Sequence, residues 1–324
     1  MKRFAFPLVL AAICCVFVAG VLELTVRFVF DDGMQFDLEM WKYAVEVKTV
    51  SDNPRIGHVH APNRHAHLMG VDFATNSRGW RDRKFTLERP GGVMRIVMLG
   101  DSFTAGWGAP YGDIFSKQVE RLYAERGIKA EAINTGVGNW NTVQEVEYFF
   151  TEMTPYNPDI VVLNFTVNDA EPVPHEKPPS LLLRHCYACV YIAGRSDTLM
   201  RQISSDPDWA SYYLGLFGDG TTPGWLDAKA SIKKLADYCR QHGIKLLIVN
   251  HPELHDVQNY RLQPITEFLR AAAKENDVPF VDLLPYLQHE ESSALWVTPP
   301  DPHPNSLAHK LMAQGIFDAL RTLE

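Results

Sequence analysis

Two hydrophobic patterns alternate along the chain from residue 94 to the C-terminus, and this alternation restricts the fold to a narrow class. Apolar runs rich in β-branched residues, typical of buried strands, cover residues 94–99, 130–137, 159–165, 244–249 and 278–283. Apolar residues with helical spacing lie between them and near the C-terminus, at about 114–126, 142–153, 226–242, 264–275 and 307–323. Alternating strands and helices form βαβ units, so we expect an α/β fold in which a parallel sheet lies between two layers of helices.

The N-terminus carries an uncharged stretch, residues 4–22, directly after Lys2 and Arg3. As a helix this stretch is about 28 Å long, close to the hydrocarbon thickness of a bilayer. The basic pair favours a cytoplasmic N-terminus. We therefore expect a single-pass signal-anchor helix over residues 1–30 in the inner membrane, with the remaining chain facing the periplasm or the outside. Two alternatives stay open: a signal peptide cleaved after a poor site at residues 18–20, and a buried helix of a soluble protein.

Charge and composition exclude several classes of protein. The 324 residues carry a net charge of -8, which argues against a nucleic-acid partner. Five cysteines are too few for a disulfide scaffold. Pro, Gly and Asn recur in residues 31–92, so we expect an irregular N-terminal arm with short strands there, followed by the main domain over 93–324. Residues 170–222 break the alternation and are interpreted as an insertion over the carboxyl edge of the sheet.

Four polar clusters follow predicted strands or precede the last helix. They cover residues 100–106 (GDSFTAG), 134–139 (NTGVGN), 166–169 (TVND) and 299–305 (PPDPHPN). Glycines in the first cluster let the chain turn tightly and leave the Ser102 hydroxyl exposed. A serine nucleophile needs a base, and the base needs an orienting acceptor; His303 and Asp301 supply that pair. Backbone N–H groups of the second cluster and the Asn168 amide are suitable donors to an oxyanion.

These clusters, in this order, resemble the four sequence blocks of the SGNH/GDSL hydrolases, from about residue 95 to the C-terminus. Residues 76–81 (NSRGWR) are similar to a segment upstream of the first block in membrane-anchored bacterial members. The resemblance implies a flavodoxin-like three-layer fold and an esterase that needs no metal or organic cofactor. It implies Ser102 as nucleophile, His303 as base and Asp301 as the partner of the base. The residues implied to form the oxyanion hole are Ser102, Gly138, Asn139 and Asn168.

The sequence departs from the family pattern in three places. Thr166 stands where the third block usually opens with glycine. In the second block, the register of the donating N–H is open among Gly136, Gly138 and Asn139. The last block has one residue between the aspartate and the histidine instead of the usual two. In a bent loop the carboxylate can still reach the imidazole; otherwise we expect a Ser–His dyad with a backbone acceptor.

Other residues have both a functional and a structural interpretation. Histidines 58, 60, 65 and 67 form two His-x-His pairs, but no cysteine or carboxylate nearby completes a metal site, so we expect an exposed arm. Cys186 and Cys189 are expected to form a disulfide rather than a zinc or haem site. We expect His309 and Cys239 to be structural and Asp101 to bond the turn. The aromatic run at 209–217 is either core packing or a platform for a sugar.

The function predicted from these features is removal of O-acyl groups, with acetyl as the expected group, from an envelope or exported polysaccharide. One alternative is an O-acyltransferase that uses the same three residues, with a sugar hydroxyl in place of water. The order of the blocks, serine first, favours hydrolysis. The other alternative is an inert sugar-binding protein on the same fold. The expected partners are an acylated carbohydrate and the membrane.

Overall fold

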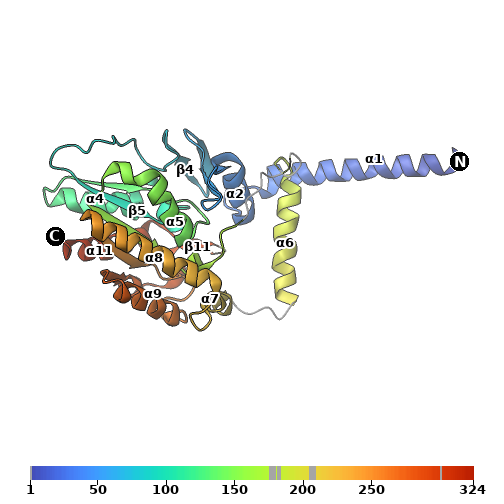
Figure 1. Cartoon of the computed structure of the whole chain (residues 1–324). Coiled ribbons are helices and arrows are strands. Elements are labelled where there is room, and N and C mark those ends of the chain that lie inside the picture. The colour runs from blue at the N-terminus through green and yellow to red at the C-terminus, as the bar shows by residue number, and fades with distance from the viewer. Residues whose placement is uncertain (1, 175–179, 181–183, 204–208, 300) are drawn as a thin grey trace.

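A five-stranded parallel sheet forms the centre of the molecule (Figure 1). The computed structural model describes residues 2–174, 180, 184–203, 209–299 and 301–324. The strands are β5 (Met94–Leu99), β6 (Ala130–Asn134), β7 (Ile160–Phe165), β8 (Lys245–Asn250) and β9 (Phe280–Asp282). Their spatial order is β6-β5-β7-β8-β9, which in chain order is the flavodoxin-like 2-1-3-4-5 arrangement. The predicted fold class is confirmed.

Helices cover both faces of this sheet. α4 (Phe115–Glu125) and α11 (Ser306–Arg321) pack on one face, while α5 (Thr142–Tyr148), α8 (Pro223–His242) and α9 (Gln263–Glu275) pack on the other. Along β5, Ile96 and Met98 belong to the apolar core under α4 and α11. Val97 and Leu99 belong to the core under α5, α8 and α9. Side chains alternate along a strand, so a strand buried on both faces is apolar throughout, as its sequence indicated.

The topology places the sequence blocks around one crevice. The chain leaves β5 toward β6 on one side and returns to β7 on the other, so the strand order reverses at β5. Doubly wound sheets bind ligands outside the carboxyl ends of the strands at such a switch point. Ser102 follows β5 and Asn168 follows β7. Two segments 66 residues apart in the numbering therefore meet at the same edge.

The N-terminal arm contains one helix and two hairpins packed on the main domain. The helix is α2 (Phe36–Lys42), and the hairpins pair β1 (Lys48–Val50) with β2 (His58–His60) and β3 (His65–Leu68) with β4 (Val71–Ala74). The expectation of an exposed arm is wrong for His58 and His60, which are buried. His65 and His67 are exposed as expected. Within the described ranges, no group of three or more His, Cys, Asp or Glu side chains could hold a metal ion.

A long helix, α1 (Lys2–Thr25), extends away from the body and continues into a π-helical turn, Val26–Phe30 (Figure 1). Residues 7–30 are long and apolar enough to cross a membrane, a property that signal sequences share. The Glu23 carboxylate near the end of α1 accepts hydrogen bonds from the backbone N–H groups of Tyr187 and Ala188. These two residues open α6 (Tyr187–Ile203), which lies across the base of α1.

The described part of the predicted insertion contributes two helices. α6 packs on α1 and α2, and Cys186 and Cys189 at its start are disulfide-bonded as expected. α7 (Trp209–Phe217) packs on α8 and α9. Its aromatic residues divide between the two interpretations, since Phe217 is fully buried in the core whereas Tyr212 is half exposed.

Candidate active site

Ser102 is the first residue of a one-turn helix, α3 (Ser102–Ala105), that begins just beyond β5. The carboxylate of Asp101 caps this helix by accepting a hydrogen bond from Phe103 N–H at 2.9 Å, as expected of a turn-bonding residue. Gly100 has no room for a side chain, because a Cβ there would lie 2.0 Å from Thr104 Oγ1. The tight turn thus depends on glycine and holds the Ser102 hydroxyl at the carboxyl edge of the sheet.

Ser102, His303 and Asp301 lie in a hydrogen-bonded line. Ser102 Oγ is 2.9 Å from His303 Nε2, and His303 Nδ1 is 2.5 Å from Asp301 Oδ1. Asp301 is fully buried, and its other oxygen accepts a hydrogen bond from Trp107 Nε1 at 2.8 Å. The arrangement has the geometry of a nucleophile, a base and an orienting carboxylate.

A short hairpin explains how a spacing of one residue builds this line. Asp301 and His303 lie on β11 (Asp301–Pro304), which pairs antiparallel with β10 (Trp296–Thr298). Residues two apart on a strand point to the same face, so carboxylate and imidazole lie side by side while Pro302 lies between them. The expected carboxylate contact is present, and a backbone acceptor is not needed. Residue 300, which belongs to the same sequence block, lies outside the described residues.

His303 and Asp301 shift each other's pKa. Burial alone would lower the pKa of His303, but the charge and hydrogen bond of Asp301 outweigh it, and this pKa lies above the ordinary histidine value. Burial alone would raise the pKa of Asp301, but the charge and hydrogen bond of His303 and the Trp107 contact lower it below its ordinary value. An ionised carboxylate therefore accepts from Nδ1–H, which leaves Nε2 as the ring nitrogen within hydrogen-bond distance of Ser102 Oγ.

Two of the three candidate peptide N–H groups in the second block have acceptors within the protein. Gly136 N–H donates to Asn134 Oδ1 at 2.9 Å, and Gly138 N–H donates to the Tyr43 hydroxyl at 2.8 Å. The expectation that Gly138 donates to an oxyanion is therefore not met, because its N–H already has a buried acceptor. Asn139 follows with a positive φ of 67° and lines the cavity that contains Ser102.

Asn168 lies opposite on a 3-10 turn, Val167–Ala170, and its side chain lines the same cavity. Thr166, which stands in place of the family's glycine, brings its hydroxyl within hydrogen-bond distance of Asn168 Oδ1 and Asp101 Oδ2. With Oδ1 near this hydroxyl, Nδ2 is the donor end of the amide, and it lies 3.5 Å from the Trp140 carbonyl oxygen. The departure at 166 thus adds an orienting contact.

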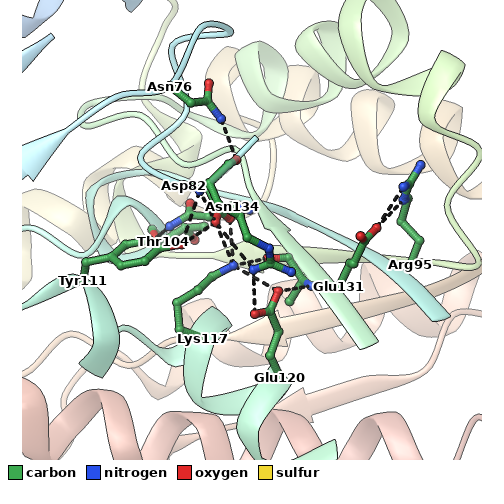
Figure 2. Close-up of polar contacts among 11 residues, drawn as sticks. Asn76, Asp82, Arg95, Thr104, Tyr111, Lys117, Glu120, Glu131 and Asn134 are labelled. Carbon is green, nitrogen blue, oxygen red and sulfur yellow. Dashed lines mark hydrogen bonds and ion pairs between the residues drawn. The ribbon is translucent and has the colours of Figure 1, made fainter. Parts of the chain in front are cut away.

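A buried polar network connects the first two sequence blocks, residues 100–106 and 134–139, to Asp82 (Figure 2). Asp82 accepts hydrogen bonds from Tyr111 OH at 2.6 Å and Asn134 N–H at 2.9 Å, and it pairs with Lys117 at 2.8 Å. Asn134 in turn donates to the carbonyl oxygen of Thr104 in α3 at 2.8 Å. This network connects Asp82 to the end of β6 and, through Asn134, to α3 beyond the end of β5.

The segment at 76–81 has a related role. Arg81 is buried and donates to the carbonyl oxygens of Ala105, the last residue of α3, and of Gly106 and Ala109, which follow α3. Burial lowers the pKa of Arg81 to about 10, yet the side chain stays charged at neutral pH. The similarity of this segment to an upstream family segment thus has a structural basis: it holds the chain just beyond Ser102.

Two neighbouring cavities share part of their lining. The smaller, about 230 Å³, contains Ser102 and His303, and its walls include Phe36, Met40 and Tyr213. The larger, about 550 Å³, has both polar and apolar lining residues. Residues that line both cavities are Asn139, Asn168 and Glu171. The two cavities are therefore adjacent at these three residues.

Several of these residues had no signal in the sequence. Trp107 lies outside the four blocks, and Phe36, Met40 and Tyr43 belong to the arm, for which only irregular structure was expected. Tyr213 falls in the aromatic run, where a cavity wall was one of two open interpretations. No spacing rule connects these positions with Ser102, because the contacts are tertiary.

A doubly wound sheet with a hydroxyl, an imidazole and a carboxylate aligned at its carboxyl edge defines the class of acyl hydrolases. The profile of the GDSL-like Lipase/Acylhydrolase family matches residues 98–311. The chain belongs to this family and is a hydrolase of ester bonds. A search of curated proteins found no match.

Solved structures with a similar course of the chain include TesA and two esterases. TesA is 12% identical with a TM-score of 0.47, and the alignment covers 71% of this chain and all of TesA. Axe2, an acetylxylan esterase from Geobacillus stearothermophilus, is 13% identical with a TM-score of 0.47, covering 70% and 94% of the two chains. A two-domain esterase active on acetylated mannans is 17% identical with a TM-score of 0.45, covering 71% and 50%.

Proposed function

We propose that this chain is a serine esterase in which Ser102, His303 and Asp301 perform the chemistry. Ser102 Oγ attacks the ester carbonyl carbon while His303 Nε2 takes the hydroxyl proton. The same proton passes to the alcohol oxygen as the carbon–oxygen bond breaks. Water then attacks the acyl-enzyme, again with His303 as base, and releases the acid. The observation that carries this proposal is the hydrogen-bonded line from Ser102 Oγ to the buried Asp301 carboxylate.

The oxyanion of the tetrahedral intermediate is stabilised by three donors in this proposal. They are the backbone N–H groups of Ser102 and Asn139 and the side-chain amide of Asn168. Ser102 N–H lies at the start of a helix, and the other two residues line the same cavity. Donors held in place before the reaction stabilise developing charge without reorganisation.

The substrate we propose is an O-acetylated envelope or exported polysaccharide. A cavity of about 230 Å³ around Ser102 suits a short acyl group. The adjoining cavity of about 550 Å³ has both polar and apolar lining residues, and the polar ones, among them Thr49, Asn141 and Glu171, offer hydrogen-bonding partners to sugar hydroxyls. In our proposal α1 anchors the enzyme in the inner membrane, with the body in the periplasm.

Chain-length selectivity tests the substrate proposal. The full chain in detergent is assayed with aryl acetate, butyrate and octanoate, and with an O-acetylated oligosaccharide from which released acetate is measured. We expect kcat/KM to be highest for the acetate among the aryl esters and the oligosaccharide to release acetate. A preference for octanoate would contradict the proposal and indicate a lipid ester. Transfer of acetyl to an added sugar, in place of release, would indicate the acyltransferase.

A further inference from the structure

The peptide group between Gly138 and Asn139 is held by the N-terminal arm. The Gly138 carbonyl oxygen accepts a hydrogen bond from Lys48 Nζ at 2.7 Å and lies 2.9 Å from His58 Nε2. Gly138 N–H, on the preceding peptide, donates to Tyr43 OH at 2.8 Å. A side chain at 138 is excluded, because a Cβ would lie 2.8 Å from the Tyr43 ring. Both backbone polar groups of Gly138 therefore end on arm residues.

Because the peptide group is planar, the contacts of the Gly138 carbonyl also determine the direction of the Asn139 N–H. A trans peptide is planar, so the C=O of residue 138 and the N–H of residue 139 point in opposite directions. The described chain has no cis peptide bonds. The carbonyl oxygen contacts Lys48 and His58, which line the larger cavity, and Asn139 also lines the smaller cavity with Ser102. Asn139 N–H is therefore directed away from the arm, toward the catalytic side.

The hydrogen-bond partners also assign the protons of the two buried histidines. A carbonyl oxygen only accepts, so His58 carries a proton on Nε2 and donates it to Gly138. His60 Nδ1 donates to Gly79 O at 3.1 Å, and His60 Nε2 accepts from Tyr43 OH. Burial lowers the pKa of both histidines to about 3, with a smaller contribution from the Lys48 charge. Both imidazoles are neutral. The N–H groups of His58 and His60 and the Tyr43 hydroxyl each donate to an acceptor.

Lys48 adds a charge to this arrangement. Its ammonium also donates to Asn139 Oδ1 at 2.9 Å, so it contacts both residues that flank the peptide. A cation on the carbonyl oxygen draws electron density along the amide, which makes the N–H at its other end a stronger donor. The carbonyl contacts thus orient the peptide and strengthen the donor.

We propose that Lys48 and His58 are positioning residues that orient and polarise the Asn139 N–H donor of the oxyanion hole. The inference rests on the proposed function, because it assumes that an oxyanion forms at Ser102. Both residues lie outside the segment matched by the family, residues 98–311. The arm of this chain therefore completes a site whose reacting groups belong to the hydrolase domain.

Substitution of Lys48 and His58 in the full chain tests the proposal. We expect Lys48→Met and His58→Leu each to lower kcat on an aryl acetate by about 10- to 100-fold at unchanged KM, since loss of a whole oxyanion donor costs about 10²–10³. Lys48→Arg and His58→Gln, which keep a donor, should restore most of the turnover. Inactivation by a fluorophosphonate, whose phosphoryl oxygen takes the place of the oxyanion, should slow in parallel.

Arg55→Met is the matched control, because Arg55 is an exposed cation of the same arm that pairs with Glu147 at 3.4 Å. Its kcat should equal that of the wild type, and melting curves should show all variants folded. If Lys48→Met fails to fold, His58→Gln against His58→Leu gives the same comparison. Unchanged kcat in folded Lys48→Met and His58→Leu would overturn the proposal, and a rise in KM alone would make Lys48 a substrate-binding residue.

The proposed function and this inference fail in different ways. If wild-type protein takes up no fluorophosphonate at Ser102, the serine mechanism fails and the arm comparison has no oxyanion to report on. If wild-type protein is labelled at Ser102 and Lys48→Met is labelled at the same rate, only the positioning role is wrong.

Discussion

At the scale of single residues, the contacts of His303 determine its pKa. It lies between a neutral hydroxyl and a buried carboxylate, and the carboxylate raises its pKa against the opposing effect of burial. His309, only six positions later, is buried without a carboxylate partner, and burial lowers its pKa to about 3. Its Nδ1 accepts a hydrogen bond from Phe115 N–H at 3.3 Å. The pKa values of these two histidines thus shift in opposite directions because their contacts differ.

Asp301→Asn and His309→Gln are expected to differ in the same assay. The first variant loses the charge that stabilises the imidazolium and the acceptor that fixes its tautomer, so kcat should fall by about 10²–10⁴. The second removes a buried ring from the core, so the melting temperature should fall more than turnover. Nearly full kcat in Asp301→Asn would show that the carboxylate does not assist the base.

The pH profile of kcat/KM reports the pKa of His303 in the free enzyme. The base must be neutral, so activity should fall as pH is lowered through a pKa above the ordinary histidine value of 6.5. Asp301→Asn removes the charge that raises this pKa, so the acid limb should move to lower pH in that variant. A limb that moves to higher pH, or that does not move, contradicts the assigned coupling.

At the scale of elements, the last hairpin and the segment before β5 determine whether the site assembles. β11 places Asp301 and His303 on one face, and the Asp82 network joins the end of β6 to α3 and α4. Lys117 lies in the first turn of α4, and its ammonium also donates to the Ala132 carbonyl at 2.8 Å. The strand ends are therefore connected by polar contacts as well as by the apolar core.

Asp82→Asn should destabilise the fold by about 3–5 kcal/mol, because it leaves the buried ammonium of Lys117 without its main partner. Urea unfolding of the full chain measures this loss. Asp237→Asn is the matched control, since Asp237 pairs with Lys233 on an exposed surface of α8 and should leave the midpoint unchanged. Equal midpoints for both variants would mean that the network contributes no stability.

The sequence predicts the sheet and its helices well because the inner strands β5, β7 and β8 are buried along almost their whole length and read as apolar runs. It also predicts which four segments meet: three follow predicted strands, and the fourth precedes the last helix. Short elements were harder to predict from the sequence. β11 was expected to be a loop, because prolines at 302 and 304 suppress the strand pattern. The burial of His58 and His60 was missed because their partners, Gly138 and Tyr43, are distant in sequence.

On the scale of the whole molecule, the arm lies between the N-terminal helix and the catalytic cavity. Glu23 near the end of α1 contacts α6, α6 packs on α2, and α2 supplies Phe36 and Met40 to the cavity wall. α1 projects from this side of the body, and the C-terminus lies at the far side (Figure 1). The site is therefore close to the base of α1.

Intact-mass analysis of protein from the membrane fraction tests whether α1 is an anchor. α1 continues without a break through residues 18–20, the candidate cleavage site. We expect the recovered mass to include residues 1–30. A soluble form beginning near Val21 would contradict the anchor and indicate a cleaved signal peptide.

The turnover of Ser102→Ala on an aryl acetate tests the central claim most directly. Removal of the hydroxyl leaves His303 and Asp301 in contact but without a nucleophile, so kcat should fall by about 10³-fold or more while melting curves match the wild type. Near wild-type turnover by folded Ser102→Ala protein would contradict the serine mechanism.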